Sequence, residues 1–182
     1  YEFGSIMKPL TMASGLDAGA ITPDTTYTDT GCITVDTESI CNWDRKARGS
    51  IPMKQIIVQS LNVGASWVAT ELGQEKFRSY FNTLFGQKTG IDLPHEGRAL
   101  LSNLSTTQQV NFDNMSFGQG IAETPLQMIR ALGSLANGGE RIALKNAAGA
   151  TIVSVVYRDN AGWPAAADGA GSSLELIDPA GA

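Results

Sequence analysis

The stretch Gly4-Ser5-Ile6-Met7-Lys8 places a serine and a lysine three residues apart, directly after a glycine. If a helix begins near Ser5, this spacing puts both side chains on one face, about one turn apart. A hydroxyl beside an amine can act as nucleophile and base, provided that burial or a nearby cation lowers the pKa of the lysine. Taken alone, the pattern is short and both residues are common, so an exposed helix start is the alternative interpretation.

Composition sets broad limits on the function of the 182-residue chain. Its 42% hydrophobic and 17% charged content is ordinary for a soluble globular protein. The net charge of -5, without any run of Lys or Arg, argues against a nucleic-acid partner. No apolar run approaches the roughly 20 residues of a membrane span. The chain starts inside a motif, so we expect membrane contact only through an anchor missing upstream.

Two cysteines, Cys32 and Cys41, flank a segment that can form a hairpin. A single disulfide in an oxidising compartment and two buried free thiols are equally compatible with this spacing. The one histidine, His95, is far from both cysteines, and the acidic residues are scattered. We therefore expect no metal site and no cofactor.

Hydrophobic periodicity predicts a mainly helical region up to about residue 137, followed by a β-rich region. Helices are expected over residues 5–16, Ile51–Gln59, Val63–Leu72, Glu75–Phe85 and onward from Thr124-Pro125. The last of these should turn Leu126, Ile129, Leu132 and Leu135 inward. Strands are expected at Cys32–Val35, Ser39–Trp43, around Ile142–Leu144, over Ile152–Tyr157 and at Leu174–Ile177, and an irregular loop at Ile21–Asp29. Trp43 and Trp67 are interpreted as packing residues, and His95 as a loop residue.

A second motif, Ser60-Leu61-Asn62, lies where one predicted helix gives way to the next. A hydroxyl and a carboxamide presented from such a turn can face a cleft together: Ser can shuttle a proton, and Asn can bind an amide and the lysine. The alternative is an ordinary turn in which Asn62 caps the following helix.

Several ordered blocks together resemble the transpeptidase domain of class B penicillin-binding proteins over about residues 1–139. The matching blocks are Gly4-Ser5-Ile6-Met7-Lys8-Pro9, Asn42-Trp43-Asp44, Gln59-Ser60-Leu61-Asn62-Val63-Gly64, Thr89-Gly90-Ile91-Asp92-Leu93-Pro94, Ser116-Phe117-Gly118-Gln119-Gly120-Ile121 and Thr124-Pro125-Leu126-Gln127-Met128. The resemblance implies an α/β fold of the β-lactamase/transpeptidase type, here mainly its helical part.

The resemblance also implies a function, the cross-linking of peptidoglycan through a serine acyl-enzyme that β-lactams also form. Ser5 would be the nucleophile, Lys8 its base, and Ser60 and Asn62 the rest of the proton relay. The Ser5 amide would donate to the oxyanion. The implied partners are peptidoglycan stem peptides and β-lactams, and the implied location is extracytoplasmic.

Two departures from the family pattern predict a weak site. Phe3 stands where the family usually has proline. The family's third motif, Lys-Thr-Gly, belongs on a strand after the Thr-Pro-Leu-Gln helix. The only copy here, Lys88-Thr89-Gly90, precedes that helix, so we expect it to be an exposed loop outside the site. Without that strand, and with Lys8 expected to sit in water with an ordinary pKa, we expect little or no turnover.

The C-terminal part, residues 140–182, resembles part of a bacterial lamin-tail domain, which has an immunoglobulin-like β-sandwich. The matching blocks are Gly138–Leu144, Val155–Asp159, Trp163-Pro164, Asp168-Gly169 and Ser173–Pro179. The alternative is a divergent C-terminal half of the transpeptidase. The resemblance implies a chimera or natural fusion near residues 135–140, and a rival function as a non-catalytic extracellular attachment module.

Overall fold

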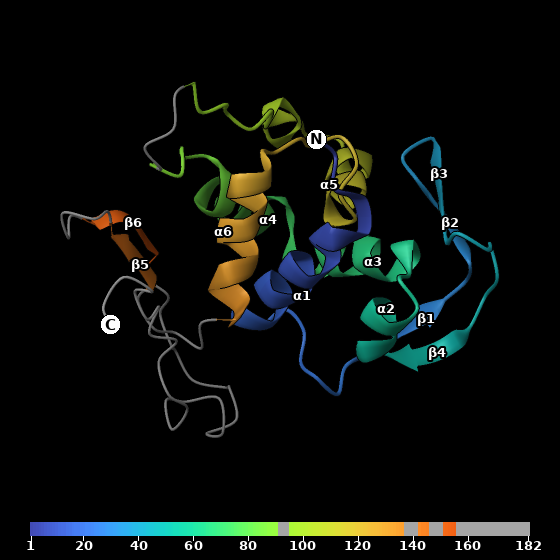
Figure 1. Cartoon of the computed structure of the whole chain (residues 1–182). Helices are drawn as coiled ribbons and strands as arrows, with labels where there is room; N and C mark the ends of the chain where they lie inside the picture. Colours follow the sequence, from blue (N-terminus) through green and yellow to red (C-terminus); the bar gives the residue numbers. More distant parts are fainter. Residues whose placement is uncertain (91–94, 137–141, 146–150, 156–182) are drawn as a thin grey trace. The chain divides into compact units, whose positions relative to one another are not determined.

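The computed structural model describes residues 1–90, 95–136, 142–145 and 151–155 (Figure 1). The chain divides into two compact units, Tyr1–Leu132 and Gly133–Ala182, and each is described here by itself. No helix among the described residues is long and apolar enough to cross a membrane.

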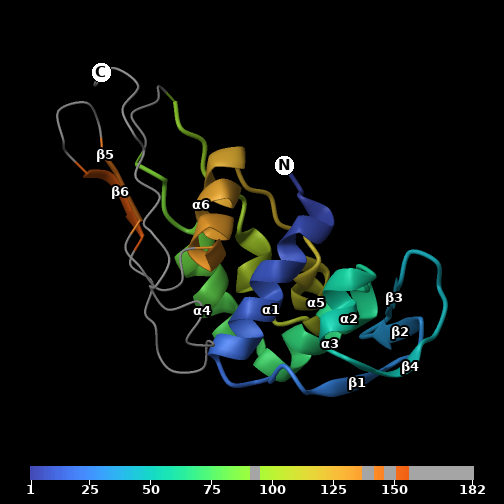
Figure 2. The same ribbon diagram turned by 60° about the horizontal axis from the view of Figure 1, so that its bottom comes forward.

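The first unit is built mainly from helices, with two small strand pairs. Its helices are η1 (Gly4–Met7), α1 (Lys8–Asp17), α2 (Lys54–Val58), α3 (Asn62–Leu72), α4 (Gln74–Phe85), η2 (Ser102–Ser105), α5 (Gln109–Ser116) and most of α6 (Pro125–Ala136). Its strands are β1 (Thr26–Asp29), β2 (Cys32–Val35), β3 (Glu38–Cys41) and β4 (Gly49–Pro52). Both views place the strands beside α2 and α3 (Figures 1 and 2).

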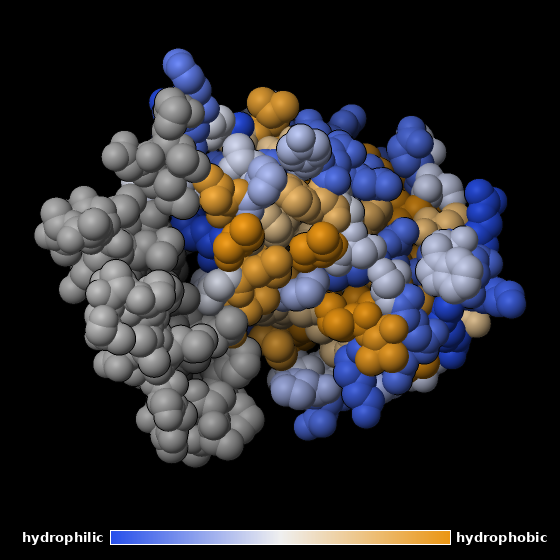
Figure 3. Space-filling model, viewed as in Figure 1, coloured by the Kyte–Doolittle hydropathy of each residue, from blue (hydrophilic) through white to orange (hydrophobic). Residues whose placement is uncertain are grey.

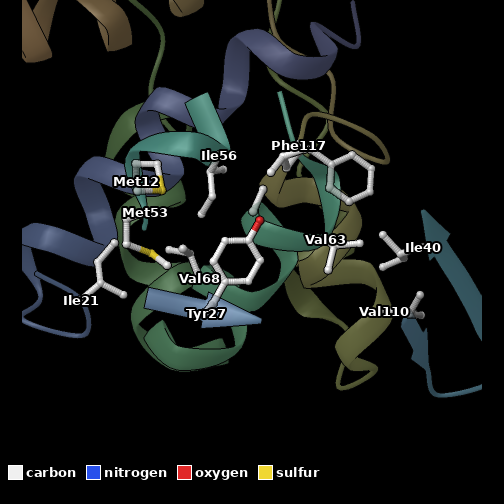
Figure 4. Packing of buried hydrophobic residues seen from close by; sticks show 12 residues of the cluster. Met12, Ile21, Tyr27, Ile40, Met53, Ile56, Val63, Val68, Val110 and Phe117 are labelled. Atoms are coloured by element: carbon white, nitrogen blue, oxygen red, sulfur yellow. The ribbon is translucent and has the colours of Figure 1, made fainter. Parts of the chain in front are cut away.

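Helix α3 forms the centre of the fold, because α1, α4 and α5 all pack against it. Its apolar residues Val63, Ala65 and Val68 are at most 2% exposed. Side chains from α1, α2, the strands and α5 converge on the same cluster (Figure 4). Burial of the larger side chains of this kind contributes about 1.5–3 kcal/mol each. The cluster therefore stabilises the packing of the helices that carry the site.

An aromatic row on α4 forms a second part of the core. Phe77, Phe81 and Phe85 recur every four residues, which places them on one helix face, and all three are buried. Phe77 stacks on Phe81 with ring centroids 4.0 Å apart and meets the edge of Phe112 from α5 at 5.7 Å. The helix predicted over residues 75–85 is confirmed as α4, and the buried aromatic row is the reason that this segment forms a helix.

Strands β2 and β3 form an antiparallel hairpin in which Cys32 lies opposite Cys41. The two cysteines form a disulfide, so of the two alternatives left open by the sequence the structure contains the oxidised one. The predicted strands at 32–35 and 39–43 are confirmed, with the second running over Glu38–Cys41.

Four expectations for the first unit are wrong in part. Residues 26–29 form β1 rather than a loop, and they pair with β4, which occupies the start of the helix expected at 51–59. Pairing buries Tyr27 against α3.

Two of these four expectations concern side chains and are also corrected. Trp43 is 76% exposed and therefore is not a packing residue, whereas Trp67 stacks on Tyr27. Ile129 of α6 is 66% exposed, because the helix instead buries Gln127, Met128 and Ala131.

Exposed apolar side chains lie among hydrophilic ones on the face shown in Figure 3. The most exposed large ones in the described part of the chain include Tyr1, Trp43, Val58 and Leu100.

The second unit contains one described hairpin, in which β5 (Ile142–Lys145) pairs antiparallel with β6 (Thr151–Val155). The predicted β character after residue 140 is confirmed for these two strands. The strand expected at Leu174–Ile177 and the blocks from Trp163 onward lie outside the described residues.

Candidate active site

Ser5 and Lys8 lie together at the start of the first helix. The chain begins with the 3-10 turn η1 and continues as α1, with Pro9 in its first turn. Proline is tolerated there because the N–H groups of a first turn have no helical acceptor. Lys8 Nζ is 3.0 Å from Ser5 Oγ. The expected placement of both side chains on one helix face is confirmed.

The turn between α2 and α3 brings the second motif to the same point. Ser60 Oγ is 2.9 Å from Ser5 Oγ and 2.9 Å from Lys8 Nζ. Lys8 also donates to the backbone carbonyl of Ser60 at 2.7 Å and to Asn62 Oδ1 at 2.8 Å. All four residues singled out from the sequence thus meet in one hydrogen-bonded group, which is the expected geometry; their catalytic roles stay predictions.

Ser60 adopts a backbone conformation that is unusual for a residue with a side chain. Its φ is +54°, in the left-handed region that favours glycine. This turn points both the hydroxyl and the carbonyl of Ser60 at Lys8. Residues outside the turn must therefore hold it in place.

Lys8 is buried, with 2% of its surface exposed, so the expectation of a solvated lysine is wrong. The turn at Ser60 and the start of α3 cover its amine. Burial lowers the pKa of Lys8 from 10.5 to about 8, because the ammonium form loses its hydration. At pH 7 about one molecule in ten then carries the neutral amine, which is the form that can accept a proton.

The four contacts of Lys8 determine where its lone pair points. A neutral amine has two N–H groups and one lone pair, and the carbonyl of Ser60 and Asn62 Oδ1 can only accept. When these two oxygens take both N–H groups, the lone pair is left for the hydroxyls. Ser60 can then donate to Ser5 Oγ while Ser5 donates to the amine. The arrangement can remove the proton of Ser5.

The backbone carbonyl of Cys41 also belongs to the hydrogen-bonded site, and the sequence did not point to it. It accepts a hydrogen bond of 2.9 Å from Asn62 Nδ2. Because the amide nitrogen is engaged there, Asn62 Oδ1 is the end that faces Lys8. No residue pattern could have shown this, since the acceptor belongs to the main chain.

The approach to Ser5 is open. Its side chain is exposed, and its amide at the start of η1 donates to no acceptor among the described residues. The preceding residue is fixed by a 3.2 Å bond from Gly4 N to the carbonyl of Gly118. An amide at a helix start is suited to an incoming oxyanion.

The early Lys-Thr-Gly copy lies in a loop, as expected. Lys88 is exposed, and residues 88–90 belong to no strand. The loop is closed on itself, because the Thr89 and Gly90 amides both donate to the carboxylate of Glu96. His95 is exposed in the same loop. Within the described ranges, no three His, Cys, Asp or Glu residues gather in a way that could hold a metal ion.

A family model, the penicillin-binding protein transpeptidase domain, matches residues 1–156. The chain is 35% identical over 142 residues to stage V sporulation protein D of Bacillus subtilis, covering 76% of this chain and 22% of that protein. It is 31% identical over 153 residues to a peptidoglycan D,D-transpeptidase FtsI homolog of Chlorokybus atmophyticus, covering 76% and 22%. The chain thus spans about a fifth of the length of these relatives.

Solved structures agree in fold. The transpeptidase domain of penicillin-binding protein 3 from Burkholderia pseudomallei superposes with a TM-score of 0.74 at 24% identity, covering 87% of this chain and 49% of that one. Penicillin-binding protein 2X from Streptococcus thermophilus gives 0.67 at 29% identity, covering 79% and 21%. The α/β fold class is therefore confirmed. The family match runs past residue 139, and the domain boundary predicted there stays a prediction.

Proposed function

This chain belongs to the penicillin-binding protein transpeptidase family, and on that premise we propose that it carries the acyl-transfer site of a peptidoglycan D,D-transpeptidase. The observation that carries the proposal is the buried Lys8 amine, held by Ser60 and Asn62 with Ser5 at hydrogen-bond distance. A serine becomes a useful nucleophile only beside such a base.

Acylation begins with transfer of the Ser5 proton to Lys8 Nζ as Ser5 Oγ attacks the carbonyl carbon between two D-alanines of a stem peptide. The oxyanion that forms is stabilised by the Ser5 amide. The C–N bond then breaks, and Lys8 returns the proton through Ser60 Oγ to the leaving D-alanine amine. Ser5 is left as an ester.

An amine of a second stem peptide resolves the ester. It attacks the ester carbonyl, gives its proton to the neutral Lys8 amine, and releases Ser5 Oγ, which takes a proton back. In a β-lactam the leaving amine stays tethered to the acyl group, so the ester persists. Stem peptides and β-lactams are thus the proposed ligands, and the site of action is extracytoplasmic.

The expected rate is low but not zero. One reason for predicting an inert site, a solvated lysine, is wrong. The other reason applies only to a polypeptide of the 182 residues given, in which no Lys-Thr-Gly follows α6. Losing one oxyanion donor costs about a hundred- to a thousand-fold in rate. For that polypeptide we therefore expect slow acylation.

A fluorescent penicillin tests the proposal. We expect covalent labelling over hours, an adduct mapped to Ser5 by mass spectrometry, and none in Ser5→Ala. The labelling rate should rise with pH through about 8, following the neutral fraction of Lys8. Labelling that persists in Ser5→Ala, or no Ser5 adduct at millimolar probe, overturns the proposal.

A second candidate function is attachment through residues 140–182, which resemble part of a lamin-tail domain. The support is the β5–β6 hairpin together with the sequence blocks quoted for that family. The transpeptidase match to residue 156 covers the same hairpin and favours the divergent-transpeptidase alternative. Sequencing codons 130–145 in intact source DNA separates a chimera from a natural chain.

A further inference from the structure

Besides Lys8, a second segment outside the turn, residues 41–48, forms hydrogen bonds to the turn that presents Ser60. Before Ser60, Gln59 Oε1 accepts from Arg48 Nε at 2.7 Å. After it, Asn62 Nδ2 donates to the Cys41 carbonyl at 2.9 Å, and the Val63 amide donates to Asn42 Oδ1 at 3.1 Å. Hydrogen bonds from this segment therefore fix the turn on both sides of Ser60, its central residue, which has a left-handed backbone conformation.

Asn42 is the buried residue that links this segment both to β1 and to the start of α3. It is 2% exposed, and its Nδ2 donates to both carboxylate oxygens of Asp29, at 2.9 and 3.0 Å. Asp29 is itself 1% exposed and lies on β1. Because a carboxylate only accepts, it fixes the orientation of the Asn42 amide and leaves Oδ1 for the Val63 amide. A flipped Asn42 would set two N–H groups against each other.

We propose that Asn42 is a positioning residue for the Lys8 base: through Val63 it sets the start of α3, and with it the two oxygens that hold the amine. Those oxygens are Asn62 Oδ1 and the Ser60 carbonyl. The described side-chain hydrogen bonds of Asn42 go to Asp29 and Val63, not to Ser5 or Lys8, so Asn42 acts through the turn. The inference rests on the proposed function in one respect, that the Lys8 amine acts as a base. The positioning of the amine does not depend on it.

The described part of the chain offers a matched control in Gln127. It is a second buried carboxamide, 1% exposed, with Nε2 donating to the carbonyls of Phe85 and Gln87 and Oε1 accepting from the Thr124 amide. Its partners belong to α4, the following loop and the start of α6, not to the turn at Ser60. Replacing either carboxamide by leucine leaves buried partners unsatisfied, so both variants should lose stability.

The experiment compares Asn42→Leu with Gln127→Leu at a temperature where both are folded. The first readout is the titration of Lys8 by NMR in lysine-labelled protein, with the signal assigned by its loss in Lys8→Arg. The described contacts of Lys8 Nζ are neutral oxygens of Ser5, Ser60 and Asn62, so its titration reports mainly its cover from water. The second readout is the labelling rate with fluorescent penicillin.

We expect Asn42→Leu to shift the Lys8 titration upward, toward 10.5, because water reaches the amine. Labelling should slow by about a hundred-fold, the effect of misplacing a catalytic group by about 1 Å. Gln127→Leu should lower the melting temperature and change neither readout. If Asn42→Leu does not fold, Asn42→Ser replaces it, since a hydroxyl is too short to bridge Asp29 and Val63, and the same changes are expected.

An unchanged Lys8 titration in a folded Asn42 variant overturns the inference, as does an equal change in Gln127→Leu. If the titration shifts as expected but the parent protein forms no Ser5 adduct, the proposed function fails and the positioning role stands. If the parent labels at Ser5 and the Asn42 variants label at the same rate, the positioning role fails and the function stands.

Discussion

The carboxamide of Asn62 donates a 2.9 Å hydrogen bond to the Cys41 carbonyl, and this contact decides which of its atoms faces Lys8. With Nδ2 engaged, Oδ1 lies 2.8 Å from Lys8 Nζ as a neutral acceptor. A neutral acceptor lets the amine lose its charge, whereas a carboxylate in the same place would stabilise the ammonium form.

Asn62→Asp should therefore raise the pKa of Lys8. An opposite charge at this distance shifts a pKa by about 1–3 units, so labelling near neutral pH should fall by roughly ten- to a thousand-fold and recover at higher pH. The measurement is the labelling rate from pH 6 to 10. Asn103→Asp is the control, because it replaces another amide that donates to a backbone carbonyl, that of Gly120. A profile that coincides with that of the parent would contradict this role.

Reduction of the Cys32–Cys41 disulfide should destabilise the first unit. The bridge closes a loop across nine residues of sequence separation. The chain-entropy relation gives about 2–3 kcal/mol for a loop of this length. Urea denaturation with and without reductant measures the change in unfolding free energy. In the double variant Cys32→Ser, Cys41→Ser the reductant should have no further effect, and a response there would show that something other than the bridge is being reduced.

The longer helices could be predicted from sequence because their signals are local. The spacing of Phe77, Phe81 and Phe85 and the glycines after α3 and α4 mark those helices without any tertiary information. The pairing of β1 with β4 could not be predicted, because both strands have four residues and the paired residues lie 20 to 26 positions apart. Helix α5 was missed because its Asn, Asp and Ser residues have low helix propensity, and it is held by burying Val110, Phe112 and Met115.

The site shows the same division. The spacing from Ser5 to Lys8 and the order of the two motifs predicted which side chains meet, since helix geometry fixes the first and the family resemblance gave the second. The burial of Lys8 could not be predicted, because it depends on a left-handed turn at Ser60 that no glycine marks. Nor could the hydrogen bonds that the Cys41 carbonyl accepts from Asn62 and that Asn42 Oδ1 accepts from Val63 be predicted, because they form where the end of the β2–β3 hairpin meets α3.

Gly118→Ala should disturb the nucleophile through its backbone. Gly118 has a φ of +82°, and a Cβ there would collide with the main chain of Gly4, the residue before Ser5. Gly120→Ala is the matched control, because its φ is +71° but its Cβ would meet only the end of the Asn103 side chain. Both variants should lose about 1–2 kcal/mol from the left-handed conformation. Only Gly118→Ala should also slow labelling at Ser5, and equal labelling rates would show that Gly4 can shift without cost.

Glu123 makes stability depend on pH. Its side chain is 2% exposed, and neither carboxyl oxygen has a hydrogen-bond partner among the described residues. Burial raises its pKa from 4.5 to about 7. Because the folded-state pKa is raised, the folded state binds the proton more tightly than the unfolded state. The stabilisation is fully present below about pH 4.5 and is lost as the pH rises through about 7.

Glu123→Gln should remove this dependence, because the amide stays neutral at every pH. Relative to the parent, the variant should gain up to about 3 kcal/mol of unfolding free energy at pH 8, the value of a shift of this size. Near pH 5, where the parent carboxyl is already protonated in the folded state, the gain should be small. Urea denaturation at the two pH values gives both numbers, with Glu38→Gln, an exposed position, as the control. A gain of equal size at pH 5 and pH 8 would mean that Glu123 acts through packing rather than through its charge.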